Sequence, residues 1–412
     1  MRINTPVVLC LTAGAISNAI PTQKRASITL PTAASRDLTE AGEQLAELTS
    51  FAQITWNQTL SSNSSIEKRS TCNLSNVAVR REWGDLANAE RKAYTDAVLC
   101  LQAKPNKTPA SLIPGARSRF DDWIGAHINQ TLTIHYTGTF LAWHRYFTWE
   151  YEQALRNECG YTGYQPYWDW SKTAVTGLES SPIFDGSEYS MSGNGEHISN
   201  RSDYVVLGDS NGVDEIIAPA GTGGGCVTSG PFKDMVVNLG PVDLVVMGNK
   251  TEANGDGLSY NPRCMKRDLT SAINKRYANA TTVVDTLIQS NTADFQEILQ
   301  GRPNSGELGA HGGGHFSFGG DPARDLYISP GDPLFFLHHG MVDRTWWIFQ
   351  GMDLEKRTGA EGIAGTATWL NSPESANTTL DTTLNLGYAA GEDIAMRDLM
   401  STIEGPFCYI YL

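Results

Sequence analysis

The 412-residue sequence has no apolar run approaching the ~20 residues that span a bilayer, which excludes a transmembrane helix. It has no Cys-x-x-Cys pair, so neither a thiolate zinc site nor a thiol redox motif is expected. Positive charge is scarce, with 31 Lys and Arg against 45 Asp and Glu. The net charge of −14 argues against nucleic acid and membranes as partners. An acidic surface that keeps the protein in solution is the simpler interpretation.

The sequence beyond residue 70 also lacks internal repeats, charge runs and proline-rich linkers. We therefore expect one large domain over residues 70–412. This domain should be mainly α, because the segments that carry its histidines have helical spacing. Residues 171–263, which include Gly221–Gly225 and many Ser, Asn and Asp, predict long loops and short peripheral strands.

Residues 1–19 predict a secretory signal peptide, because a basic residue precedes a short apolar stretch that ends in small residues. We therefore expect a secreted, extracellular protein. Residues 20–69 hold two dibasic pairs, Lys24-Arg25 and Lys68-Arg69, on either side of a stretch with helical spacing. They predict a propeptide or an N-terminal helical arm.

Cysteine usage agrees with export. Cys10 lies in the predicted signal, and the six remaining cysteines form an even set, which in an oxidising compartment implies three disulfides. The sequence does not determine their pairing; we favour Cys72–Cys408, Cys100–Cys159 and Cys226–Cys264. Nine Asn-x-Ser/Thr sequons fit a glycoprotein, at Asn57, Asn63, Asn73, Asn106, Asn129, Asn200, Asn249, Asn279 and Asn377.

Seven of the eight histidines gather in two short stretches. The first stretch contains His127, His135 and His144, and the second contains His311, His315, His338 and His339. His197 stands apart in a Gly/Ser/Asn-rich loop, where we expect a solvent-exposed side chain. Imidazole is a preferred ligand of zinc, copper, iron and nickel, and three imidazoles hold one such ion with a position left open. The two stretches therefore predict a paired metal site.

The first cluster fits two helix faces. Beyond a predicted start at Ser118, His127 shares one face with Phe120 and Ile124. A second helix is expected to begin near Trp143, with His144 facing the core. A single inward histidine is more often a hydrogen-bonded core residue than a ligand. Two on separate faces, joined by His135, favour ligands.

The second cluster is denser. His311 and His315 have i, i+4 spacing, which places both on one face if the segment is helical; a flexible His-Gly loop is the alternative. Asp332-Pro333 predicts a helix start. On that helix His339 is the predicted ligand, and His338 is a neighbour that points about 100° away.

Other side chains are expected to support the site. Asp343, one turn after His339, is predicted to accept a ring N–H and orient a ligand. Phe335, one turn before His339, and Phe316, beside His315, are candidates for an apolar wall on which a substrate packs; simple core packing is the alternative for both.

The missing carboxylates indicate which metal to expect. Dinuclear hydrolases usually join their ions through a carboxylate, but no Asp or Glu lies within the short histidine spacings of either cluster. Two sets of three imidazoles suit copper, because Cu(I) tolerates three nitrogen ligands. Two Cu(I) ions together can deliver two electrons to one O2, so we expect two copper ions per chain and O2 as co-substrate.

Three motifs resemble the tyrosinase, catechol oxidase and hemocyanin family. They are Thr139–Phe147 (TFLAWHRYF), Pro166–Trp170 (PYWDW) and Asp332–Arg344 (DPLFFLHHGMVDR). The resemblance covers nearly all of residues 72–412. It implies an antiparallel four-helix bundle around a dicopper centre, with His127, His135 and His144 on the first copper and His311, His315 and His339 on the second.

The sequence departs from many tyrosinases at positions near the metals. Thr133 replaces a cysteine that crosslinks to the second histidine, and Ala142 replaces a proline. Gly312 stands where many members have Asn, and Gln300 where they have Glu; these two residues are thought to hold a water that accepts the proton of a monophenol. Neither a glycine nor a neutral amide can take a proton.

The resemblance therefore implies a polyphenol oxidase that converts o-diphenols (catechols), and also o-aminophenols, to o-quinones, with weak hydroxylation of monophenols. A catechol has only to deliver two electrons and two protons, whereas a monophenol of pKa near 10 must first bind as phenolate, which a base assists. A hemocyanin-like oxygen carrier is the alternative function, and a dizinc or metal-free protein is a third. The sequence leaves the oligomeric state open.

Overall fold

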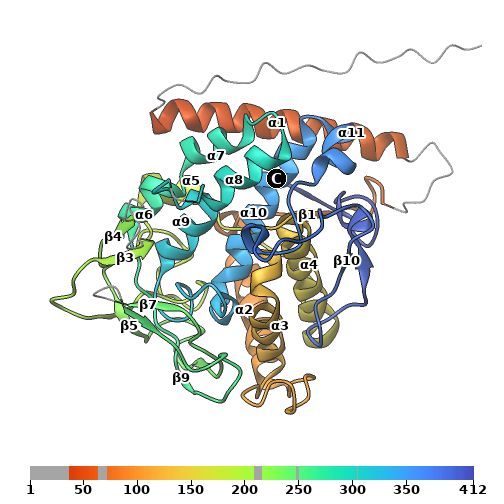
Figure 1. The fold of residues 1–412 in the computed structure, drawn as a ribbon. Coiled ribbons are helices and arrows are strands. Elements are labelled where there is room, and N and C mark those ends of the chain that lie inside the picture. The colour runs from red at the N-terminus through yellow and green to blue at the C-terminus, as the bar shows by residue number, and fades with distance from the viewer. Residues whose placement is uncertain (1–36, 64–71, 208–215, 247–249, 304) are drawn as a thin grey trace, which may run out of the picture. The chain divides into compact units, whose positions relative to one another are not determined.

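The computed structural model describes residues 37–412 apart from 64–71, 208–215, 247–249 and residue 304. The predicted signal peptide, both dibasic pairs and the Asn249 sequon lie outside the described residues. The fold is mainly helical, as predicted (Figure 1). Its α-helices are α1 Leu38–Asn63, α2 Asn88–Ala103, α3 Arg119–Ile134, α4 Phe140–Cys159, α5 Trp170–Thr176, α6 Ser271–Tyr277, α7 Ala280–Leu287, α8 Thr292–Gln300, α9 Gly309–Phe318, α10 Leu334–Gly351 and α11 Leu354–Arg357.

The strands are short and pair two by two. Most of them lie between residues 195 and 264, which confirms the predicted region of loops and short strands. Five 3₁₀ turns are described as well: η1 Trp83–Asp85, η2 Ser329–Gly331, η3 Ala360–Gly362, η4 Trp369–Asn371 and η5 Met396–Leu399. The strands are β1 Ala78–Arg80, β2 Gly195–His197, β3 Tyr204–Leu207, β4 Ile216–Ala218, β5 Gly224–Val227, β6 Val236–Val237, β7 Leu244–Val246, β8 Lys250–Glu252, β9 Arg263–Cys264, β10 Thr383–Leu384, β11 Ile394–Ala395 and β12 Tyr409–Tyr411.

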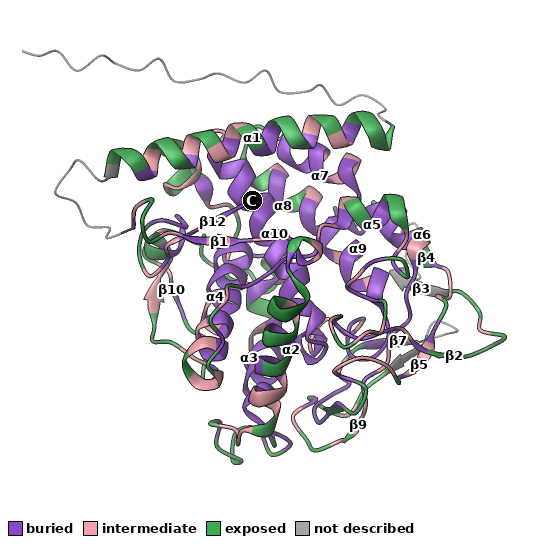
Figure 2. Cartoon of the chain, turned by 180° about the vertical axis from the view of Figure 1, so that it is seen from behind, coloured by how far each residue is buried: buried purple, intermediate pink, exposed green. Residues whose placement is uncertain are grey.

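Helix α1 is part of the folded core. It packs on α10 and α7, and one face is buried along its length (Figure 2). Trp56 on that face stacks on Trp347 with ring centroids 5.9 Å apart, and its indole N–H donates to the Trp347 carbonyl at 3.1 Å. Helix α1 and the described residues that follow it accordingly belong to one compact unit. The domain start at residue 70 and the propeptide stay predictions.

Helix α10 is the central helix of this unit. Every residue from Leu334 to Gly351 is buried, as expected for a helix dominated by apolar side chains, and α1, α4, α7 and α9 all pack against it (Figure 2). The helix begins one residue after the predicted Asp332-Pro333 start, and Oδ1 of Asp332 accepts from the Leu334 N–H at 2.9 Å. The same carboxylate pairs with buried Arg267, which fixes where the helix begins.

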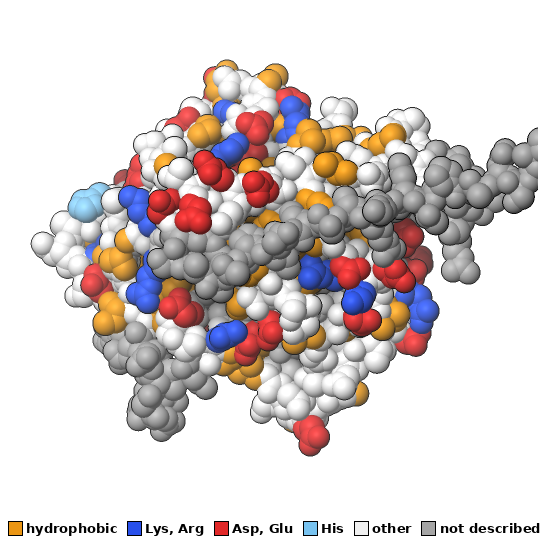
Figure 3. Space-filling model, turned by 90° about the horizontal axis from the view of Figure 1, so that it is seen from above, with side chains coloured by type: hydrophobic (Ala, Val, Ile, Leu, Met, Phe, Trp, Pro, Cys, Tyr) orange, Lys and Arg blue, Asp and Glu red, His pale blue; other side chains and the backbone are white. Residues whose placement is uncertain are grey.

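The structure contains the three favoured disulfides, Cys72–Cys408, Cys100–Cys159 and Cys226–Cys264. One sequon is not at the surface: Asn279 is buried and caps α7, because its Oδ1 accepts from the Thr282 N–H at 3.0 Å. Among the described residues, none of the helices is long and apolar enough to cross a membrane. On the face shown in Figure 3, acidic and basic side chains are interspersed and do not form a patch of one sign.

Candidate metal centre

The first histidine trio comes from α3, α4 and the turn between them. Helix α3 begins after Ser118, as predicted, where Oγ accepts from the Asp121 N–H at 3.2 Å and Asp121 accepts from the Ser118 N–H at 2.8 Å. His127 lies on α3 and His135 directly follows its last residue. His144 lies on α4, which begins at Phe140, three residues before the predicted start. All three rings are buried.

The two histidines of the His-Gly-Gly-Gly-His segment lie on helix α9, so the alternative of a flexible loop is wrong. Two of its glycines are required by close packing. A Cβ on Gly314 would lie 2.1 Å from Cε1 of His338, and one on Gly313 would lie 2.5 Å from Cβ of Tyr277. A Cβ on Gly312 would meet only the Leu308 side chain, at 3.4 Å. Glycine therefore lets α9 approach α10 closely enough for the histidines to meet.

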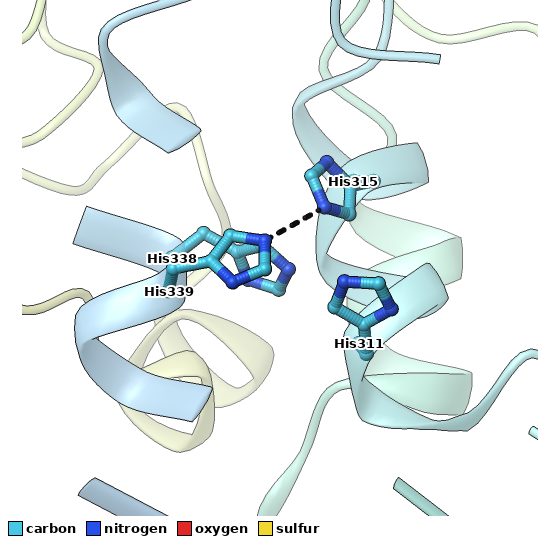
Figure 4. Close-up of side chains that lie close together, drawn as sticks. All are labelled: His311, His315, His338 and His339. Atoms are coloured by element: carbon cyan, nitrogen blue, oxygen red, sulfur yellow. Dashed lines mark hydrogen bonds between the residues drawn. The ribbon is translucent and has the colours of Figure 1, made fainter. Parts of the chain in front are cut away.

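The two trios face one another. His144 stacks on His339 with ring centroids 4.5 Å apart, and His135 lies 5.8 Å from His311. Within each cluster the candidate ligand atoms lie within 4.8 Å of one another, and among the described residues both clusters consist of histidines alone. Figure 4 shows the second cluster, where His311 and His315 project from one helix towards His339 on the next.

Hydrogen bonds orient the first trio for metal binding. Nδ1 of each ring bonds to a backbone carbonyl: His127 to Tyr327 at 2.8 Å, His135 to Thr131 at 2.9 Å and His144 to Phe140 at 2.8 Å. A carbonyl only accepts, so each Nδ1 carries the proton and Nε2 keeps its lone pair. Nε2 of His127 and of His144 is buried without a hydrogen-bond partner. Such a buried lone pair fits a metal ion.

The second cluster separates into three available rings and one engaged ring. Nε2 of His311 is buried without a partner, and Nε2 atoms of His315 and His339 lie 3.3 Å apart (Figure 4). Nδ1 of His338 accepts the indole N–H of Trp170 at 3.1 Å. A neutral imidazole has one such lone pair, so His338 has none left for a metal while this bond lasts. This geometry favours the predicted role of His338 as a neighbour.

Burial keeps these imidazoles neutral. Removal from water, reinforced for most of them by neighbouring histidines, lowers the pKa of all seven rings below the ordinary value. Burial lowers the pKa of His135 to about 4. Neutral rings are the form that binds metals, and bound cations would satisfy several buried nitrogens at once. The donor set therefore fits two copper ions.

The role predicted for Asp343 is wrong. Its Oδ1 accepts from Arg145 at 2.6 Å, and its Oδ2 accepts from the hydroxyls of Tyr409 and Tyr411, each at 2.6 Å. Nδ1 of His339, the nearest predicted ligand along the helix, has no hydrogen-bond partner. Asp343 instead anchors α10 to α4 and β12. Burial raises its pKa, but Arg145, Arg80 and the two hydroxyls outweigh this and lower it overall.

The four residues predicted to line a substrate pocket differ in how far they are exposed. Phe335 is fully buried and stacks on His339 with ring centroids 4.0 Å apart, so it is the floor beneath the histidines and not an accessible wall. Gly312 and Phe316 are half-buried on α9. Phe316 packs against a buried cluster that includes Ile273 and Tyr277, so core packing describes it. Gln300 is buried, and its Oε1 accepts from the Tyr136 N–H at 2.8 Å. Gln300 thus fastens the residue that follows His135.

The isolated His197 is exposed, as predicted, and its Nδ1 lies 3.1 Å from the Thr222 carbonyl. Sequence reasoning missed two tryptophans at the site. Trp170 lies in the Pro166–Trp170 motif, and its place in this motif was the only indication in the sequence that it belongs to the site. Trp369 lies in a polar segment far from any histidine, and nothing in the sequence pointed to it.

Four helices, the turn after α3 and six available imidazoles define a helical protein with a paired metal centre. Residues 117–352 match the common central domain of tyrosinase. The chain belongs to the tyrosinase family, whose members are copper-binding oxidoreductases with a dicopper centre.

The similarity extends along most of the chain. Tyrosinase P of Aspergillus terreus is 42% identical over 336 residues, which cover 81% of this chain and 91% of the relative. The N-acetyl-6-hydroxytryptophan oxidase ivoB of Emericella nidulans is 37% identical over 351 residues, covering 82% of this chain and 93% of the relative. The structure of a mutant polyphenol oxidase from Thermothelomyces thermophila superposes with a TM-score of 0.84 at 44% identity, over 90% of this chain and 98% of that one.

Proposed function

We propose that this chain is a secreted copper oxidase that uses O2 to convert catechols and o-aminophenols to quinonoid products, with weak activity on monophenols. His127, His135 and His144 would hold one copper ion, and His311, His315 and His339 the other. The bound copper pair would pass electrons from substrate to O2. The arrangement of histidine-bearing helices as an antiparallel four-helix bundle stays a prediction.

The observation that carries this proposal is the orientation of the ring nitrogens. The first trio directs its protonated nitrogens to backbone carbonyls, which leaves Nε2 of His127 and of His144 buried and unpartnered. Metal ligation is the interaction that satisfies buried lone pairs of this kind at a cluster without carboxylates.

The preference for catechols is supported by the residues at positions 312 and 300. Glycine at 312 provides no side chain, and the Gln300 amide cannot accept a proton. The amide oxygen of Gln300 also accepts a hydrogen bond from the Tyr136 N–H, so Gln300 has a structural role. A monophenol would therefore lack a side-chain base at these two positions, whereas a catechol does not depend on one in the same way.

The choice of substrate class is supported by the relatives. They include proteins described as tyrosinases and one described as an oxidase of N-acetyl-6-hydroxytryptophan, which is a hydroxyindole and not a simple phenol. An enzyme is therefore favoured over an oxygen carrier. Export is supported by the three disulfides, which form and persist in oxidising compartments.

A substrate panel tests the proposal. Copper-loaded protein is given matched sets of a phenol, the corresponding catechol and the corresponding o-aminophenol, and O2 uptake is followed together with product absorbance. We expect uptake with catechol and o-aminophenol and little with phenol; the copper-free protein is the control. A phenol oxidised as fast as its catechol would remove the proposed preference. Reversible O2 binding without any turnover would identify a carrier.

A further inference from the structure

We propose that Trp369, with Leu370 beside it, forms one side of the substrate entrance and selects phenols that carry a bulky apolar substituent. This inference rests on the proposed function. It names a specificity-determining residue on η4 that no histidine motif contains.

Trp369 lies beside the first trio. Its ring centroid is 6.5 Å from that of His135, and it meets the ring of Tyr136 edge to face at 4.7 Å. Trp369 is half-buried, and the adjoining Leu370 is 49% exposed. Part of the Trp369 indole is therefore exposed next to His135, a proposed copper ligand.

Backbone hydrogen bonds fix this turn to the segment that carries His135. The Leu370 N–H donates to the Tyr136 carbonyl at 3.2 Å, and the Gly138 N–H donates to the Thr366 carbonyl at 2.9 Å. The two segments approach so closely that a Cβ on Gly138 would lie 2.9 Å from the Gly365 carbonyl oxygen. The position of Trp369 relative to His135 is thus set by the main chain.

The turn also holds a non-glycine residue in an unfavourable conformation. Leu370 has φ +48° and Asn371 has φ +58°, both in the left-handed region. Asn371 is suited to this region, and its side chain accepts from the Ser375 N–H at 2.9 Å. Leu370 has no polar side chain that could compensate in this way. Residues that adopt an unfavourable backbone conformation are found most often at ligand sites. Here the conformation leaves an apolar side chain exposed beside Trp369.

Access to the metal centre points towards this turn. Among the six proposed ligands, His315 and His311 keep the most exposure, 8% and 5%, whereas His127 and His339 keep at most 1%. The opening therefore lies on the α9 side of the centre, where His311 approaches His135 to 5.8 Å. Trp369 lies beside His135 on this side of the centre, with ring centroids 6.5 Å apart.

The chemistry of the opening then defines the preferred substrate. A catechol that binds through its two oxygens directs the opposite edge of its ring, and any substituent there, away from the histidines. Such a substituent leaves the centre along the side formed by Trp369 and Leu370. Both side chains are uncharged and apolar over most of their surface, so an aromatic or branched aliphatic substituent gains buried contact there. An unsubstituted catechol does not reach them.

Substitution of Trp369 tests this inference. Trp369→Leu removes the indole and keeps an apolar side chain, and Trp369→Phe keeps an aromatic ring. Trp149→Leu is the matched control, because Trp149 is also half-buried but packs on Phe407 and Tyr146, not on a histidine. Each copper-loaded variant is assayed with catechol and with 4-tert-butylcatechol, and its copper content is measured.

We expect Trp369→Leu to lower kcat/KM for 4-tert-butylcatechol about tenfold, mainly through KM, while kcat/KM for catechol changes less than about twofold. Trp369→Phe should recover most of the loss, and Trp149→Leu should behave as the wild type. An equal loss with both substrates, or a loss of copper, would mean that Trp369 merely supports His135 and would overturn the inference. No change with either substrate would overturn it as well.

A binding measurement separates this inference from the proposed function. Benzoate and 4-tert-butylbenzoate are not oxidised, and their Kd values for the copper-loaded protein can be measured by calorimetry. Trp369→Leu should weaken binding of the substituted benzoate about tenfold and leave benzoate unchanged. If the wild type oxidises no catechol, the proposed function fails, but this pair of Kd values still decides whether Trp369 contacts the substituent.

Discussion

The imidazoles of His144 and His339 stack with ring centroids 4.5 Å apart and an interplanar angle of 16°. One ring comes from α4 and the other from α10, and these two helices pack directly on one another. The distance between the two trios is therefore set by helix packing and not by loops. This makes the centre sensitive to changes in the helices that carry it.

The two adjacent histidines of α10 should differ in copper binding. We expect His339→Asn to lower the copper content from about two ions per chain to about one and to abolish oxidation of catechol. His338→Asn should keep about two, because the Asn amide oxygen can still accept the Trp170 N–H. Metal analysis of the two variants, with His197→Asn as the exposed control, measures this. Loss of copper in the His338 variant alone would reverse the assignment.

The glycines of α9 should respond oppositely to alanine. Gly314→Ala places a Cβ 2.1 Å from the His338 ring, so we expect a loss of about 1–3 kcal/mol in the free energy of unfolding and weaker copper binding. Gly312→Ala, two residues away, has room for its methyl group and should be neutral or stabilising by up to about 1 kcal/mol. Urea unfolding of both variants gives the comparison. Equal effects would contradict the packing argument.

Supplying the missing polar groups should raise activity on monophenols. Gly312→Asn fits because only the Leu308 side chain lies near its Cβ, and Gln300→Glu keeps an oxygen for the Tyr136 N–H. We expect the double variant to raise the ratio of monophenol to catechol turnover about tenfold or more, because a positioned base assists phenol deprotonation. Initial rates on matched substrates measure the ratio, with Gly312→Ala as the control. An unchanged ratio at full copper content would refute the assigned cause.

The buried carboxylate of Asp343 should be important for stability. Asp343→Asn leaves Arg145 and Arg80 buried without this counterion, and we expect a loss of about 3–5 kcal/mol in the free energy of unfolding. The exposed pair of Arg397 and Asp381 is the control, and Asp381→Asn should cost less than about 1 kcal/mol. Chemical denaturation distinguishes the two. A small effect at Asp343 would show that the arginines find other partners.

The metal-free protein should lose stability in mild acid. Burial lowers the pKa of the seven clustered histidines in the folded state, so the unfolded chain takes up protons first as the pH falls. The free energy of unfolding should hold steady above the ordinary histidine pKa of about 6.5 and decline from there towards pH 4, by up to about 1.4 kcal/mol per pH unit for each titrating ring. Urea midpoints of the copper-free protein between pH 7.5 and 5 test this. A constant midpoint over that range would rule it out.

The sequence was sufficient for features that depend on local spacing. The i, i+4 spacing of His311 and His315 placed them on one helix face, and the spacing of Phe120, Ile124 and His127 predicted helix α3. Helix geometry also predicted that His338 and His339 point in different directions. Each of these patterns lies within one or two turns of one helix, although the Trp170 N–H that engages His338 comes from a distant segment.

The roles of Asp343, Phe335 and Trp369 depend on partners from distant segments and were not predicted correctly. Helical spacing placed Asp343 one turn beyond His339, but its partners come from β12 and α4, which the spacing does not contain. Phe335 was placed on the correct face, yet whether that face lies under or over the histidines depends on how α10 packs. Trp369 reaches His135 only because backbone hydrogen bonds fasten its turn there.

Strand β12 pairs in parallel with β1, and Cys408, just before β12, is bonded to Cys72, just before β1. Residues 72 to 408 are thus a closed ring of chain, fastened at one place by a covalent bond and a strand pair. A protease that cuts a surface loop anywhere in this ring would leave a single covalent molecule until the disulfide is reduced. The disulfide and the strand pair also hold the two ends of this segment together. A single cut in the segment should therefore not release a fragment, as it would from a chain without this disulfide.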